Sequence, residues 1–310
     1  MPETARPYFS LFISQPALLK QIAQDNLSRY PGFSMGENVL ISLILNEMVG
    51  TEYMETGKYV QPSTRLTPAL VIYLIDASAS MNDPCGPNMP ITKMALVNAA
   101  LREGIKGMVL RSMRDNKVQP RYHIAMFAYS TTVLDLLDGI RGLPDLMRVG
   151  GPPELQAGGN ATDTAAGFGM VEKLLQQHLT TYKSCPAPLV CHLTDALRTT
   201  QDPSPIVQRI RAMSVDDGPV LVENVLMAEK MLRKQVKDWQ KWGGVVKARQ
   251  MTDGYARLLF GLSSPLPETY RQNMNKTAGY QLQKNARLFF PGTQPELVRL
   301  AVAASSATQI

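Results

Sequence analysis

The stretch that most constrains this fold is an apolar run that stops abruptly at a carboxylate. Residues 70–75 read Leu-Val-Ile-Tyr-Leu-Ile and are followed by Asp76, with Ser78 and Ser80 at the next alternate positions. A short run that is apolar throughout is typical of a central parallel strand, buried on both faces by helices. The pattern predicts a carboxylate and two hydroxyls at the carboxyl end of this strand, which is the edge where open α/β sheets bind ligands.

The chain beyond this stretch alternates predicted strands with predicted helices. Strands are expected near residues 122–128, 132–137, 189–193, 220–227 and 286–290. Helices are expected near residues 90–114, 204–213, 254–262, 266–277 and 295–304. An irregular loop is expected over residues 139–162, and a further helix is expected directly after it. The short link after residue 128 forces an antiparallel pair and leaves one strand at the sheet edge. The alternation predicts an α/β fold with a doubly wound, mostly parallel central sheet and one antiparallel edge strand.

The segment before the first strand has a different pattern and predicts a separate part of the chain. Ser34 and Glu37 form a capping box at a helix start, and Gly50 stands where a helix would end. We expect residues 1–67 to be a helical extension and linker, and residues 68–310 to form the sheet domain.

Composition and charge narrow the class of protein. The chain has 310 residues, of which 45% are hydrophobic and 19% charged, as expected for a folded globular protein. The net charge of +6 is too thinly spread to imply nucleic acid by itself. Three cysteines without a CxxC pair suit a reducing compartment, and we find neither a secretory signal nor a membrane-spanning run. We expect a soluble, cytoplasmic protein without a membrane part.

Three polar segments are predicted to converge on one site. Asp76 follows the first strand and Asp195 follows the strand near 189–193, while Thr164 enters a helix between them. Because parallel strands share one carboxyl edge, these groups should meet there with Ser78 and Ser80. Hydroxyl and carboxylate oxygens select a hard cation, and we predict Mg²⁺, with Mn²⁺ or Ca²⁺ as alternatives.

These residues resemble the von Willebrand factor A family and its metal-ion-dependent adhesion site. Asp76, Ser78 and Ser80 match the family's Asp-x-Ser-x-Ser motif, Thr164 matches its threonine, and Asp195 matches its second aspartate. The glycine that usually follows that aspartate is replaced by alanine here. The resemblance covers about residues 68–307. Residues 255–268 also look similar to intracellular bacterial members associated with kinases, PP2C-like phosphatases and tellurite resistance.

The resemblance implies a protein-binding module rather than an enzyme. In this family an open position on the metal accepts an aspartate or glutamate from a partner protein. The expected setting is a bacterial signalling or stress-response assembly with a kinase or a phosphatase. The alternative is a subunit that works with an AAA+ ATPase, as in metal chelatases, and a metal-dependent hydrolase is a third, weaker reading. Residues 86–93 lack the second glycine of a P-loop, so ATP binding of that kind is not expected.

A basic segment with two tryptophans, residues 229–250, is the second candidate site. It leaves the strand near 220–227 on the metal's side of the sheet. We expect either a docking rim for an acidic partner or a solvated helix with inward tryptophans. Nucleic acid is a weaker candidate for such a segment. The candidate partner-binding residues are Lys234, Lys237, Trp239, Lys241 and Trp242.

The remaining reactive side chains have plainer interpretations. His123, His178 and His192 show no metal-binding spacing and are expected to be structural. Cys85 lies near the predicted metal site, and its thiol is expected to have no role there. Glu223 and Asn224 stand inside a predicted buried strand, and the sequence alone explains neither.

Overall fold

The computed structural model describes residues 58–86, 89–196, 199–228, 231–278, 280–292 and 294–304. The chain divides into two compact units, Met1–Met54 and Glu55–Ile310, and the first lies outside the described residues. The helical extension expected over residues 1–67 therefore falls largely outside them and stays a prediction. Within the described ranges, no helix is both long and apolar enough to cross a membrane.

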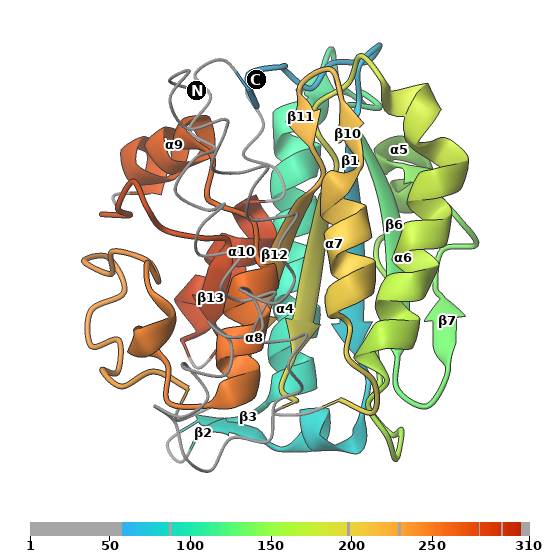
Figure 1. Ribbon diagram of the computed structural model, residues 1–310. Helices are drawn as coiled ribbons and strands as arrows, with labels where there is room; N and C mark the ends of the chain where they lie inside the picture. The colour runs from blue at the N-terminus through green and yellow to red at the C-terminus, as the bar shows by residue number, and fades with distance from the viewer. Residues whose placement is uncertain are drawn as a thin grey trace, which may run out of the picture. The chain divides into compact units, whose positions relative to one another are not determined.

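The core of the described unit is a seven-stranded, mostly parallel sheet (Figure 1). The strand order is β13 (Phe289–Pro291), β12 (Leu221–Leu226), β9 (Leu189–Thr194), β1 (Ala69–Asp76), β6 (Tyr122–Tyr129) and β7 (Val133–Asp135). β7 and the two-residue β8 (Arg141–Gly142) both pair with β6 antiparallel, whereas the other neighbours are parallel. The predicted doubly wound sheet with an antiparallel edge strand is confirmed.

β1 lies in the middle of the sheet and is buried along its whole length. Burying each of its large apolar side chains contributes roughly 1.5–3 kcal/mol, which favours the central position. Its register pairs Ile75 with Leu193 of β9 and Asp76 with Tyr129 of β6. The carboxylate is therefore carried to the shared carboxyl edge, beside Thr194 at the end of β9.

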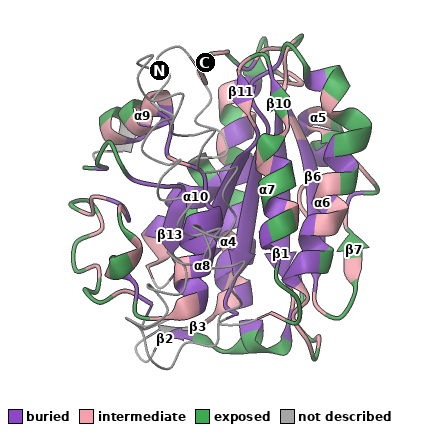
Figure 2. Ribbon diagram, in the orientation of Figure 1, coloured by how far each residue is buried: buried purple, intermediate pink, exposed green. Residues whose placement is uncertain are grey.

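Helices cover both faces of the sheet (Figure 1). α4 (Lys93–Ser112) and α10 (Pro295–Ala304) pack on one face, where Val71, Tyr73 and Ile75 of β1 point. α6 (Thr164–His178), α7 (Ser204–Ala212) and α8 (Gly254–Leu262) cover the other. Figure 2 shows the central strands buried between these layers. The burial pattern is that of a three-layer α/β domain.

Short elements complete the described chain. They are η1 (Ala79–Asn82), β2 (Pro84–Gly86), β3 (Met89–Thr92), β4 (Met113–Arg114), β5 (Lys117–Val118), α5 (Leu143–Arg148), η2 (Leu179–Tyr182), β10 (Ser214–Val215), β11 (Gly218–Pro219), η3 (Ala248–Gln250) and α9 (Glu268–Ala278).

The structure corrects four predicted segments. The helix expected from Pro90 begins at Lys93, because Pro90 lies in the β2–β3 hairpin and Thr92 caps the helix by accepting from the Ala95 N–H at 3.1 Å. The loop expected over 139–162 contains β8 and α5. The strand expected over 286–290 is β13, three residues long. Residues 231–247 are irregular, so the helix considered for the basic segment is wrong.

Candidate metal centre

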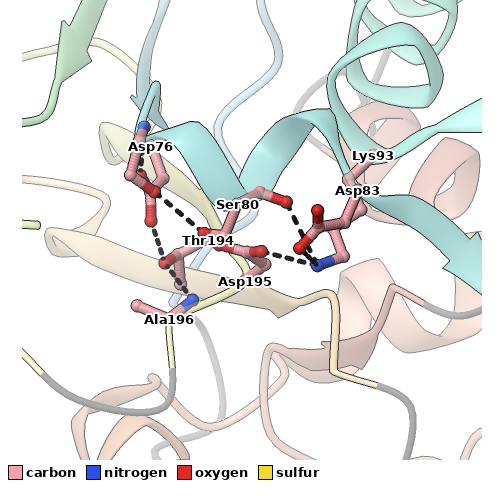
Figure 3. Close-up of polar contacts among 8 residues, drawn as sticks. Asp76, Ser80, Asp83, Lys93, Thr194, Asp195 and Ala196 are labelled. Carbon is pink, nitrogen blue, oxygen red and sulfur yellow. Dashed lines mark hydrogen bonds and ion pairs between the residues drawn. The ribbon is translucent and has the colours of Figure 1, made fainter. Parts of the chain in front are cut away.

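Asp76 is the buried centre of the polar cluster at the carboxyl edge. Its Oδ1 accepts a hydrogen bond from the Ser78 N–H at 2.8 Å, and its Oδ2 accepts one from Thr194 Oγ1 at 2.7 Å (Figure 3). The Asp76 residue is fully buried. The two hydrogen bonds join the loop after β1 to the end of β9 and fix the orientation of the carboxylate.

Ser78 and Ser80 connect this carboxylate to the second one. Ser80 Oγ donates to Asp195 Oδ1 at 2.8 Å and lies 3.2 Å from Ser78 Oγ. Ser78 is buried and Ser80 is exposed, so the cluster runs from the core to the surface.

Thr164 lies deeper in the same region. It is the first residue of α6, whose N-cap Asp163 accepts from the Ala166 N–H. Thr164 Oγ1 lies 3.1 Å from the Tyr255 hydroxyl, and the Thr164 residue is fully buried. Its hydroxyl makes no hydrogen bond to either carboxylate among the described contacts. Four of the five predicted ligands are thus linked directly, whereas the Thr164 hydroxyl contacts Tyr255 instead.

Lys93 is a site residue that the sequence analysis missed. Its Nζ lies 2.6 Å from Asp195 Oδ2 and 3.3 Å from the Ser80 carbonyl oxygen (Figure 3). The Lys93 side chain is 13% exposed and that of Asp195 is 2% exposed. A positive residue at the start of a helix opposes the helix dipole, and this unfavourable placement is the signal that could have identified it.

The electrostatics of the cluster favour a cation. Burial raises the pKa of Asp76, hydrogen bonds from Ser78 and Thr194 oppose that rise, and the charge of Asp195 adds to it. The pKa of Tyr129 is raised well above its usual value, first by burial and then by the charge of Asp76. A positive charge at the cluster would relieve both effects.

The donor set fits a hard divalent cation. Two carboxylates and three hydroxyls from three loops provide oxygen atoms only. Within the described ranges, no group of three or more His, Cys, Asp or Glu residues forms a metal cluster of the ordinary kind. The Lys93 ammonium on Asp195 shows that this edge accepts a positive group.

A buried hydrogen-bond chain lies behind the cluster and explains Asn224. Tyr129 OH lies 2.7 Å from His192 Nε2, and His192 Nδ1 lies 2.7 Å from Asn224 Oδ1. Asn224 Nδ2 donates to Ser263 Oγ at 2.9 Å, which leaves Oδ1 to accept from the histidine. Burial lowers the pKa of His192 to about 4, so the ring is neutral and accepts from Tyr129. Asn224 therefore joins β12 to β9 and α8.

His123 and the three cysteines are buried or hydrogen-bonded, whereas His178 is exposed. His123 Nδ1 lies 2.8 Å from the Tyr182 hydroxyl, which fits the structural role expected for it. The thiols of Cys85, Cys185 and Cys191 are free and buried. His178 ends α6, and no described contact gives it a further role.

The basic segment has inward-packed tryptophans but not the helix considered for it, and the docking rim for an acidic partner stays a prediction. Trp239 and Trp242 are half-buried, with ring centroids 5.4 Å from Tyr280 and 5.7 Å from Phe290, respectively. The three lysines are exposed, and they are Lys234, Lys237 and Lys241. The tryptophans thus pack onto the domain while the charges face solvent. No described contact joins this segment to the carboxylate cluster.

No family model matches the chain, and no curated protein matches it in sequence. Among solved structures, it is similar to the vWF domain of the pilus tip protein Mfa5 from Porphyromonas gingivalis, with 19% identity and a TM-score of 0.30 over 42% of this chain and 38% of that one. It is also similar to the pilus adhesin SpaC from Lactobacillus rhamnosus GG, with 9% identity and a TM-score of 0.45 over 80% and 31%.

A third similar structure is proximal thread matrix protein 1 from the mussel byssus, which has zinc in its MIDAS motif. The identity is 13% and the TM-score 0.34, over 53% of this chain and 36% of that one. This chain spans about a third of the length of these three proteins. At such low identity the interpretation of the site depends on its own geometry.

Proposed function

We propose that this chain carries a von Willebrand factor A-type domain that binds a partner protein through a divalent metal. The metal would be held by Asp76, Ser78, Ser80, Thr164 and Asp195. The observation that most supports this is the hydrogen-bonded cluster that places two buried carboxylates and two serine hydroxyls at one sheet edge, with an ammonium on one carboxylate.

The roles of the residues follow from their contacts. Asp76 is oriented by Ser78 and Thr194, and Asp195 by Ser80, so neither carboxylate needs to reorganise widely to bind a cation. The serines add neutral oxygens, so few negative charges surround the site. A metal bound there would supply an electrophilic centre that accepts a carboxylate from the partner. The Ser80 hydroxyl donates to an Asp195 carboxylate that is also paired with Lys93, and we propose that this cluster binds a partner rather than catalyses a reaction.

Mg²⁺ is the metal we propose first, because hydroxyl and carboxylate oxygens are its preferred protein ligands. Mn²⁺ and Ca²⁺ use similar donors and are the alternatives. The absence of sulfur and imidazole from the proposed ligand set makes zinc a weaker fit.

Calorimetric titration with Mg²⁺ tests the site directly. Wild type should bind saturably, and Asp76→Asn should lose binding because the amide keeps the shape but removes the charge. Asp145→Asn is the matched control, since Asp145 is exposed on α5 and pairs with Arg148. Circular dichroism should show that all three proteins are folded. Undiminished Mg²⁺ binding by Asp76→Asn would contradict the site assignment.

The proposal also includes the class of protein that binds at this site. A kinase or PP2C-like phosphatase of a bacterial cytoplasmic stress-response assembly is proposed first, and an AAA+ ATPase is the alternative. Capture on the immobilised protein, with Mg²⁺ or with EDTA, should recover a partner only with the metal. The identity of that partner then decides between the two assemblies, and an EDTA-insensitive partner would argue against metal-mediated docking.

The exposed lysines of the basic segment are proposed as an accessory contact for an acidic partner. Lys234, Lys237 and Lys241 all face solvent, so they are available to a second protein. Trp239 and Trp242 would act by fixing the segment on the domain through their ring contacts. The same charges would also increase the rate of association with an acidic surface.

A further inference from the structure

Lys93 reaches the carboxylate cluster from the N-terminal end of a helix, where a positive charge is unfavourable. It is the first residue of α4, and the first turn of α4 contains no acidic residue to offset its charge. A cation in the first turn of a helix is disfavoured by the helix dipole. The side chain nevertheless reaches back to Asp195 and is mostly buried there. The pairing, not the local helix, determines where this ammonium lies.

The contacts of Lys93 use oxygen atoms that a metal would need. Asp195 Oδ2 receives the ammonium at 2.6 Å, and Asp195 Oδ1 receives the Ser80 hydroxyl at 2.8 Å. Both oxygens of this carboxylate are therefore engaged. A divalent cation that used Asp195 would stand beside a like charge only a few ångströms away, and such repulsion is strong where water is largely excluded.

A second acceptor for the ammonium lies close by. Asp83 Oδ2 is 3.9 Å from Lys93 Nζ, and the Asp83 side chain is 67% exposed. The backbone N–H of Lys93 donates to the Asp83 carbonyl oxygen at 3.0 Å, which keeps the two residues together. A change of side-chain rotamer would bring the ammonium from Asp195 to Asp83 without moving the helix.

We propose that Lys93 is a tethered cation that competes with the divalent metal for Asp195 and moves to Asp83 when the metal binds. This inference rests on the proposed metal site. In the metal-free protein, Lys93 neutralises a buried carboxylate and keeps the cluster assembled. The same contact lowers the affinity for metal, so the site fills only at metal concentrations high enough to displace the ammonium.

Calorimetric titration of Lys93→Met with Mg²⁺ tests the competition. Methionine keeps much of the apolar length of the side chain and removes the charge. We expect Mg²⁺ affinity to rise by about tenfold or more, because a like charge beside the metal is gone. Lys106→Met is the matched control, since Lys106 is exposed on the same helix and its loss changes the net charge equally. Its affinity should equal that of wild type.

A thermal melt supplies a second readout that also monitors folding. Without metal, Lys93→Met should melt below wild type because Asp195 loses its buried partner. With saturating Mg²⁺, the variant should gain more in melting temperature than wild type does, since tighter binding stabilises more. Asp83→Asn should weaken Mg²⁺ binding in wild type and leave it unchanged in the Lys93→Met background.

The outcomes separate the two proposals. Equal Mg²⁺ affinity in wild type, Lys93→Met and Lys106→Met would overturn the competition while leaving the metal site in place. Weaker binding by Lys93→Met would also overturn it, because Lys93 would then assist the metal. No binding by any of the three proteins would overturn the metal site itself, and the competition with it.

Discussion

Glu223 is a fully buried acid on β12 with an incomplete set of hydrogen bonds. Its Oε1 accepts from Cys191 Sγ at 3.1 Å, and its Oε2 has no hydrogen-bond partner among the described residues. Burial raises the pKa of Glu223 from 4.5 to about 8. The carboxyl group is therefore protonated in the folded protein at neutral pH, which avoids placing an unpaired charge in the core.

This raised pKa predicts that stability falls with rising pH. Between pH 4.5 and about 8 the folded state keeps a proton on Glu223 that the unfolded state has lost, so the free energy of unfolding decreases. The pKa of His192, lowered from 6.5 to about 4, has the opposite effect below pH 6.5. The net decrease should therefore appear between pH 6.5 and 8 and amount to about 1–2 kcal/mol.

Urea unfolding at pH 6.5 and pH 8 measures this decrease. Glu223→Gln should remove it and should be more stable than wild type at pH 8. Glu172→Gln is the control, because Glu172 pairs with Arg209 near the surface and should leave the decrease intact. A decrease that persists in Glu223→Gln would assign the pH dependence to other groups.

The sequence predicted some site residues and not others, for a physical reason. Asp76, Ser78, Ser80 and Asp195 follow buried strands directly, so the parallel sheet alone brings them to one edge. Lys93 reaches Asp195 across 102 residues of sequence, and that contact depends on where a helix starts relative to a distant strand. Asn224 has its partners on β9 and α8. A local pattern can mark Lys93 as unusual at a helix start, but it does not identify the distant partner in such contacts.

At the scale of elements, α4 and α10 pack so closely that one glycine is required between them. A Cβ on Gly104 of α4 would lie 2.5 Å from Val302 Cγ1 on α10. A Cβ on Gly107, one turn later, would meet only the Arg111 side chain, at 3.4 Å. The two glycines thus occupy the same helix with different surroundings.

Alanine substitutions at these two positions should have opposite effects. Gly107→Ala should raise the free energy of unfolding by about 0.5–1 kcal/mol, because alanine has the higher helix propensity. Gly104→Ala should lower it by about 1–2 kcal/mol, because overpacking against α10 exceeds that gain. Urea unfolding of both variants checks this. Stabilisation by Gly104→Ala would show that α4 and α10 can shift enough to accommodate the added methyl group.

The elements themselves were predictable where their patterns are long. The buried strands and helices α4, α6, α7, α8 and α10 follow clear apolar periodicity. The predicted start of α4 was wrong because a proline is tolerated in an edge strand as well as in the first turn of a helix, and only the pairing of β2 with β3 decides between them. α5 was missed because six residues in a Gly- and Pro-rich segment contain too little periodicity to detect.

At the scale of the whole molecule, the positive charge of the basic segment should affect binding more than folding. Reversal of Lys234, Lys237 and Lys241 to glutamate should slow association with the partner recovered in Mg²⁺, and added salt should reduce the difference from wild type. Surface plasmon resonance at two salt concentrations measures this.

The matched control reverses three exposed lysines elsewhere, Lys117, Lys173 and Lys183. It changes the net charge equally, so it separates a local contact from a general attraction. Equal slowing by both triple variants would remove the basic segment from the binding surface.

The two outer strands have a consequence for self-association. β7 and β13 are each three residues long, and β13 ends in Pro291, which has no N–H to donate. Trp242 packs against Phe290 on the same strand. Short edge strands, one of them with a tryptophan packed against it, leave few free backbone groups onto which another copy could add a strand. The sheet is thereby protected against the edge-to-edge stacking that leads to aggregation.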